Sequence, residues 1–210
     1  ASVKVEYNVN GIWQTKAPTY AGTYEVKVSV PGNSYFTAAS TTKTYTIKPR
    51  GVEISGITAN KKVYDGTKDA ELDYSKVVFA RLIEGDALTV SAEGTFADSN
   101  AAKGKTVTIT NLVLGGKSAS NYVLTADGQQ AGTIADINPK RITVTADNLK
   151  KIVGGADPVL TYTASGLVGE DTLSGIVVKR KAGEKVGTYA IKVSQKKGTN
   201  PNYRITFKKG

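Results

Sequence analysis

Apolar and polar residues alternate one by one in several short stretches of the chain, which is the pattern of β-strands with one buried face. In Val186–Ser194, the side chains of Tyr189, Ile191 and Val193 fall on one face and polar or small residues on the other. A nearly identical stretch, Ala21–Ser29, occurs near the other end of the chain. This recurrence predicts tandem repeats of a β domain.

Other short motifs recur in the same order in the middle and the last third of the chain. The matched pairs are Asn60–Gly66 with Asn148–Gly155, Leu82–Leu88 with Leu167–Leu173, Ala102–Ile109 with Lys185–Ile191, and Asn121–Leu124 with Asn202–Ile205. Gly, Asn and Asp residues separate the predicted strands at a spacing typical of Ig-like sandwiches. The expected fold class is all-β, with tandem Ig-like antiparallel β-sandwich domains joined end to end.

Pro49 and Pro139 mark the expected domain boundaries, because each follows a predicted strand that contains an isoleucine. Proline has no N–H for a ladder and forces the preceding residue into an extended conformation. We therefore predict domains at 1–48, 49–138 and 139–210, each with its own interior and joined by short, stiff linkers. Residues 1–48 contain about four predicted strands. They lack the first half that is present in each of the next two domains, so this domain is either truncated or a shorter variant.

Composition excludes several kinds of chemistry. The chain has no Cys and no His, which rules out disulfides, Cys/His zinc sites and Cys or His nucleophiles and bases. No apolar run approaches the ~20 residues of a membrane span. No signal peptide is visible, and we expect targeting and anchoring segments to lie outside this chain. No catalytic constellation stands out, so the chain is expected to be neither an enzyme nor a cofactor protein.

The net charge of +10 is concentrated in the last domain. Residues 140–210 carry fourteen Lys and Arg against five acids, including the run Lys179, Arg180 and Lys181. One interpretation is an anionic partner, such as an acidic glycan or a cell-wall polymer. The other, which we favour, is a solvated and soluble strand surface.

Two sets of motifs carry a resemblance to known repeats. The middle domain, through Lys62-Val-Tyr-Asp-Gly-Thr67, Gly85-Asp86 and Asn121-Tyr122, resembles the YDG-type repeat of large bacterial surface proteins. The last domain, through Thr161-Tyr162, Gly166-Leu167, Gly169-Glu-Asp171 and Gly187-Thr-Tyr189, resembles the MBG-type repeat. Residues 1–48 are similar to the back half of an MBG-type or bacterial Ig-like repeat. The resemblance implies adhesin-like proteins outside the cell and supplies no shared ligand or catalytic residue.

Two places are candidates for ligand binding. Tyr64 and Asp65 have the composition of a sugar-binding tip, but a turn in which Asp65 bonds its own backbone, Gly66 has positive φ and Tyr64 packs beneath is favoured. Trp13 is either an exposed sugar-stacking platform or a half-buried core aromatic, and we favour the latter.

Three further hypotheses are weaker. Acidic residues at Glu84, Asp86, Asp98, Glu170 and Asp171 suggest Ca²⁺ between domains, but they match no known loop template. Lys and Asn residues suggest internal isopeptide bonds on residue type alone. Nucleic acid is not expected as a partner, because Tyr189 lies on an inward face.

The expected function is a structural stalk of a bacterial cell-surface adhesin, which presents a distal binding region and adheres weakly itself. The alternative is a module for anionic or host glycans in the basic third domain, with Lys179, Arg180 and Lys181 as ligand contacts. Expected partners are host or cell-wall glycans or host surface proteins. The chain is expected to be extracellular and monomeric, without membrane insertion.

Overall fold

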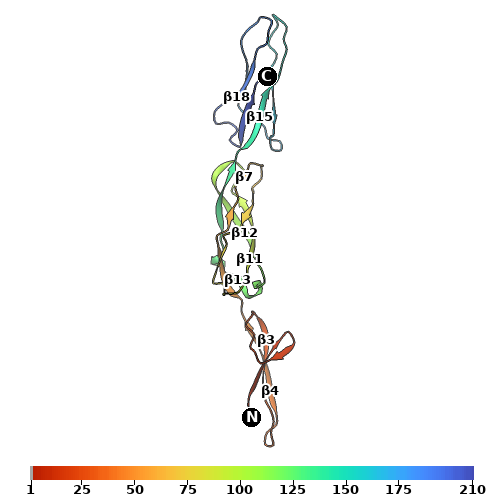
Figure 1. Cartoon of the computed structure of the whole chain (residues 1–210), viewed down its shortest axis with the longest axis vertical. Coiled ribbons are helices and arrows are strands. Elements are labelled where there is room, and N and C mark those ends of the chain that lie inside the picture. The colour runs from red at the N-terminus through yellow and green to blue at the C-terminus, as the bar shows by residue number, and fades with distance from the viewer. Residues whose placement is uncertain (1) are drawn as a thin grey trace. The chain divides into compact units, whose positions relative to one another are not determined.

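The computed structural model describes residues 2–210, and it is built almost entirely of β-strands (Figure 1). Two 3₁₀ turns, η1 (Ala119–Asn121) and η2 (Ala126–Gly128), are the helical elements of this part of the chain. No helix among the described residues is long and apolar enough to cross a membrane. The prediction of an all-β fold is confirmed.

The chain folds into two compact units. The first comprises residues 2–57, 74–92 and 111–130, and the second comprises residues 58–73, 93–110 and 131–210. This division passes through the expected middle domain, so the predicted boundaries at Pro49 and Pro139 stay predictions.

The N-terminal part of the first unit is one open antiparallel sheet in the order β2-β1-β3-β4. Its strands are β1 (Lys4–Val9), β2 (Ile12–Gln14), β3 (Gly22–Val30) and β4 (Ala39–Ile47). The hairpin of β3 and β4 is paired along its whole length, from Gly22 opposite Ile47 to Val30 opposite Ala39. None of residues 2–48 is buried, because this sheet has no second layer within the described chain. The four predicted strands are present.

The rest of the first unit is organised around β5. A three-stranded sheet has the order β10-β5-β13, formed by β5 (Arg50–Ser55), β10 (Val78–Ala80) and β13 (Tyr122–Leu124). Val52 and Ile54 of β5 and the following Ile57 are buried, with exposed fractions of 0%, 4% and 1%. The alternating apolar positions of β5 therefore supply the core of this region, as expected for a half-buried strand.

Between Pro49 and Pro139, a five-stranded sheet has the order β7-β14-β12-β11-β8, and a small pair joins β6 to β9. These strands are β6 (Thr58–Ala59), β7 (Lys62–Val63), β8 (Asp69–Ala70), β9 (Leu72–Asp73), β11 (Thr89–Phe96), β12 (Ala102–Gly115) and β14 (Gly132–Asn138). In the second unit, Phe96, Val107, Ala135 and Ile137 are buried on this sheet. The pairing of β12 with β14 shifts register between Ala102 and Lys105, as a β-bulge would produce.

After Pro139 the second unit contains two further sheets, β16-β15-β19 and β17-β18. The strands are β15 (Lys140–Ala146), β16 (Tyr162–Ser165), β17 (Ile176–Arg180), β18 (Ile191–Gln195) and β19 (Tyr203–Lys208). Ile142 and Val144 of β15 and Ile191 and Val193 of β18 belong to one buried cluster. The two sheets therefore share a core in the manner of a small sandwich.

Three strand pairs in these sheets are parallel. β13 runs parallel to β5, β14 parallel to β7, and β19 parallel to β15. In the last domain the chain leaves the first sheet after β16, forms β17 and β18, and returns as β19. A strand that returns through such a crossover can run in the same direction as the first one.

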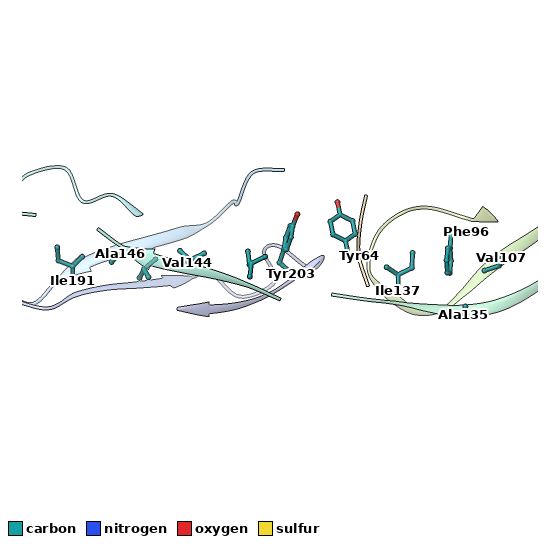
Figure 2. Close-up of a cluster of buried hydrophobic side chains, with 11 residues drawn as sticks. Tyr64, Phe96, Val107, Ala135, Ile137, Val144, Ala146, Ile191 and Tyr203 are labelled. Carbon is teal, nitrogen blue, oxygen red and sulfur yellow. The ribbon is translucent and has the colours of Figure 1, made fainter. Parts of the chain in front are cut away.

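The interior of the second unit does not stop at Pro139. One cluster of buried residues contains Tyr64 and Ile137 on one side of the proline and Val144 and Tyr203 on the other (Figure 2). The expectation of a separate interior for each domain is therefore wrong at this boundary. The physical reason is that two tyrosine rings fill the space at the junction of the two domains.

Candidate functional site

Two of the recurring sequence motifs, the Asn-Tyr motif and the Leu82–Leu88 motif, are joined by a hydrogen bond between a tyrosine and an aspartate. In the first unit, Tyr122 Oη donates to Asp86 Oδ2 at 2.6 Å and accepts from Ile83 N at 3.0 Å. Asp86 N also donates to the carbonyl oxygen of Ile83 at 3.1 Å, which closes a tight turn. The Asn-Tyr motif thus anchors the turn of the Leu82–Leu88 motif.

The second unit repeats this arrangement. Tyr203 Oη donates to Asp171 Oδ2 at 2.5 Å and accepts from Val168 N at 3.0 Å. Asp171 N donates to the carbonyl oxygen of Val168 at 2.9 Å. The two recurring motifs therefore have one structural cause, which is a tyrosine hydroxyl that holds a turn against the start of a domain.

A third tyrosine extends the pair across Pro139. Tyr64 Oη donates to the same Asp171 Oδ2 at 2.9 Å. The rings of Tyr64 and Tyr203 meet edge to face, with centroids 5.5 Å apart and planes at 83°, a favourable geometry for aromatic pairs. Tyr64 is 7% exposed and Tyr203 is 8% exposed, and Figure 2 shows the two rings facing each other. One carboxylate oxygen therefore joins the YDG-like motif to the last domain.

An asparagine completes this joint. Asn202 Oδ1 accepts from Ala101 N at 2.8 Å, and Asn202 Nδ2 donates to Asn100 Oδ1 at 3.0 Å. We call Tyr64, Ala101, Asp171, Asn202 and Tyr203 the Pro139 joint. Asn121, the counterpart of Asn202 in the first unit, makes the same kind of contact, since its Oδ1 accepts from Ala21 N at 2.9 Å. The Asn of each Asn-Tyr motif thus binds the backbone of the preceding domain.

We expect Asn202→Ala to lower the free energy of unfolding by about 0.5–1.5 kcal/mol, because a part-buried N–H of Ala101 loses its acceptor. Chemical denaturation followed by Tyr fluorescence measures this change. Asn148→Ala is the matched control, since Asn148 is an exposed asparagine of the same domain. Equal effects of the two substitutions would contradict the role assigned to Asn202.

The Asp65-Gly66 turn has the conformation that the sequence predicts. Asp65 Oδ1 accepts from Thr67 N at 2.9 Å and from Lys62 Nζ at 2.9 Å, and Gly66 has φ +82°. A side chain at Gly66 would place its Cβ 3.2 Å from Val168 Cγ1, so the turn lies against the last domain. The polar atoms of Tyr64 and Asp65 are thus engaged within the chain.

The surroundings of the Pro139 joint disfavour charge on its tyrosines. Burial, and then the hydrogen bond to the Asp171 carboxylate, raise the pKa of Tyr203 to about 12. The same two causes raise the pKa of Tyr64 above its ordinary value of 10.0. Both hydroxyls therefore remain protonated donors at neutral pH.

The basic run Lys179–Lys181 is not presented as one patch. Arg180 Nη2 contacts Asp157 Oδ1 at 2.9 Å and Glu184 Oε1 at 2.8 Å, and Lys151 Nζ contacts the same two carboxylates. The Arg180 guanidinium also lies 5.5 Å from the centre of the Tyr189 ring. Lys179 and Lys181 are exposed. The structure therefore assigns Arg180 to an internal ion network and leaves the two lysines available to solvent.

Trp13 lies on the open N-terminal sheet and is 37% exposed. Lys27 Nζ is 5.8 Å from the centre of its ring. Trp13 is thus a partly exposed aromatic on a sheet without buried residues, and both its role as a core aromatic and its role as a sugar-stacking platform stay predictions.

The candidate residues of the second unit do not form one site. Lys179 belongs to β17, whereas Tyr64 follows β7 and is buried in the Pro139 joint. Among residues 2–210, no group of three or more acids could hold a metal ion. The arrangement that the structure does build from the recurring motifs is the joint itself.

Comparisons with known proteins agree with the motifs. Residues 46–131 match the model of the YDG domain, and residues 142–210 match the model of the MBG domain (YGX type). A search of curated proteins finds no match. The repeated Tyr–Asp turns and the two family models together identify residues 46–131 as a YDG domain and residues 142–210 as the MBG domain that follows it.

Proposed function

We propose that this chain is a structural spacer of a bacterial cell-surface adhesin, which holds a more distal binding region away from the cell. The observation that carries the proposal is the Pro139 joint, where two buried tyrosines share one carboxylate oxygen. A spacer needs domains that keep a fixed orientation to their neighbours. A packed and hydrogen-bonded joint supplies that property, whereas a flexible linker does not.

The joint resists bending through several independent contacts. Movement between the two sides of Pro139 breaks the Tyr64–Asp171 bond and the Ala101–Asn202 bond, and it exposes two aromatic rings. Each loss is unfavourable, since a buried hydroxyl without a partner costs about 1–3 kcal/mol. Repetition of such units adds reach while every domain contributes its own interactions. In this proposal the chain has no catalytic role and acts outside the cell.

A distance measurement across the joint tests the proposal. The chain lacks cysteine, so two nitroxide labels can be placed at Lys68→Cys and Lys192→Cys, both at exposed positions of the second unit. Pulsed electron spin resonance is expected to give one narrow distance distribution. Tyr64→Ala should broaden it, because the ring and its bond to Asp171 are removed.

Val63→Ala is the matched control, since Val63 precedes Tyr64 and is 54% exposed. It should leave the distribution narrow. A broad distribution in the parent protein, or no broadening by Tyr64→Ala, contradicts a stiff joint and with it the spacer function.

A further inference from the structure

The two copies of the sequence motif that recurs at both ends of the chain form strands of different length. In the first copy, β3 is a strand throughout Gly22–Val30. In the second copy, β18 begins only at Ile191, and residues 186–190 are not in a strand. β17 pairs with β18 as far as Arg180 opposite Ile191. Ala190 O accepts from Lys181 N at 2.9 Å on the β17 side, but within residues 2–210 no strand pairs with the other edge of Val186–Ala190. In the first copy, β4 pairs with β3 from Gly22 onward.

The last residue already lies beside that unpaired stretch. Gly210 N donates to Ile191 O at 3.1 Å, and Ile191 N donates to Gly210 O at 3.3 Å. In the preceding domain, Ile109 N donates to Ala131 O at 2.9 Å, and Ile109 is the sequence counterpart of Ile191. Ala131 leads directly into β14, which runs antiparallel along β12. Gly210 therefore takes the place of Ala131, at the point where such a strand begins.

A cleft lies where the strand would run. It has a volume of about 490 Å³, and its lining is mixed. Leu149, Val153, Leu160 and Tyr189 contribute apolar surface, and Lys150, Lys151, Arg180, Glu184 and Lys185 contribute charged groups. Val153 and the neighbouring Ile152 are 61% and 85% exposed, and Val186, which also borders the cleft, is 91% exposed. Apolar side chains at such exposure mark a surface that is normally covered.

The preceding domain shows what covers the equivalent surface. There β14 pairs on its second edge with β7, with Ile137 opposite Lys62 and Asn138 opposite Val63. Tyr64 N donates to Asn138 O at 2.8 Å. The loop Asn148–Gly155 is the sequence counterpart of Asn60–Gly66. It therefore lacks the neighbour that orders residues 62–64.

We propose that the MBG domain accepts one further β-strand, continuing from Gly210, antiparallel to Val186–Ile191 and beside the Asn148–Gly155 loop. The strand has the pattern of residues 132–138, with small or apolar side chains at alternate positions facing inward. In that segment Ala135 and Ile137 are 8% and 1% exposed, whereas Ile134 is 67% exposed. Main-chain hydrogen bonds to the neighbouring strand provide the affinity, and the inward side chains fix the register of the pairing. This inference concerns one domain and does not depend on the spacer function.

The test is a protein of residues 1–210 with a copy of residues 132–138 joined after Gly210. Hydrogen exchange is expected to slow by about tenfold at the amides of Gly187 and Tyr189, because these alternate residues face the added strand as Ile191 faces Gly210 and gain ladder partners. A copy that carries Ile137→Asp should lose this protection, since it replaces the inward apolar side chain that is 1% exposed in the preceding domain with a carboxylate. A copy that carries Ile134→Asp should keep it, because that side chain faces solvent. Exchange at β5 serves as the internal reference.

Three results would overturn the proposal. The first is unchanged exchange at Gly187 and Tyr189 in the extended protein. The second is equal protection by the Ile137→Asp and Ile134→Asp copies, which would show that no inward register exists. The third is a concentration-dependent dimer of the unextended chain that protects the same amides, which would assign this edge to a second copy. None of them bears on the distances measured across the Pro139 joint.

Discussion

Replacement of Asp171 by alanine is expected to destabilise the second unit by about 2–4 kcal/mol, because two buried tyrosine hydroxyls lose their acceptor together. Tyr64 and Tyr203 both donate to Asp171 Oδ2. After the substitution, Tyr203 Oη still accepts from Val168 N, but the protons of both hydroxyls have lost the carboxylate. Denaturant unfolding gives the loss in stability, and the nitroxide pair described above gives the loss of joint stiffness.

Glu170→Ala provides the control for this experiment, since Glu170 is the adjacent acid and is exposed. It should change stability by less than about 0.5 kcal/mol, the usual range for surface substitutions. Asp86→Ala is a useful comparison in the first unit, where one tyrosine, Tyr122, depends on the aspartate. An Asp171→Ala variant as stable as the Glu170→Ala variant would show that the carboxylate does not hold the joint.

Alkaline pH is expected to destabilise the second unit, and the titration of Tyr203 determines the pH range in which this stability is lost. The pKa of Tyr203 is about 12 in the folded protein, against 10.0 for an unperturbed tyrosine. The folded state therefore retains a proton that the unfolded state releases above pH ~10. The stabilisation is fully present below pH ~10 and is lost as the pH rises through the folded value.

Denaturation midpoints measured from neutral to strongly alkaline pH follow this loss, with tyrosinate absorbance as a second observable. Tyr203→Phe should make the alkaline slope shallower, because one of the two tyrosines of the joint with a raised pKa is gone. Tyr162→Phe is the control, since Tyr162 lies in the same domain and is only partly buried. The same alkaline slope in the parent protein and in Tyr203→Phe would contradict the assignment.

The sequence predicted the all-β fold, the repeats and the Asp65-Gly66 turn because these depend on local patterns. Alternation places residues on a face, and a turn needs only the residues within it. The partner of Tyr64 could not be predicted in this way, because Asp171 lies far along the chain and on the other side of Pro139. The signal was present in the repeated Asp and Asn-Tyr motifs, but only the structure shows that they bind each other.

Two expectations failed for a related reason. Val186–Ser194 has strand alternation throughout, yet only Ile191–Gln195 is a strand, because ladder bonds need a neighbour that local sequence does not specify. Arg180 was grouped with Lys179 and Lys181 by charge. Alternation along β17 separates their side chains, and Asp157 and Glu184 take up the guanidinium.

The slot that Tyr64 fills has a consequence for the order of the repeats. In the MBG domain the corresponding residue is Val153, which has no hydroxyl to donate. A neighbour attached beyond the MBG domain therefore cannot be secured by the bond that secures the MBG domain to the YDG domain. The two kinds of repeat are not interchangeable parts, and shuffling them changes the mechanical strength of the chain at each connection.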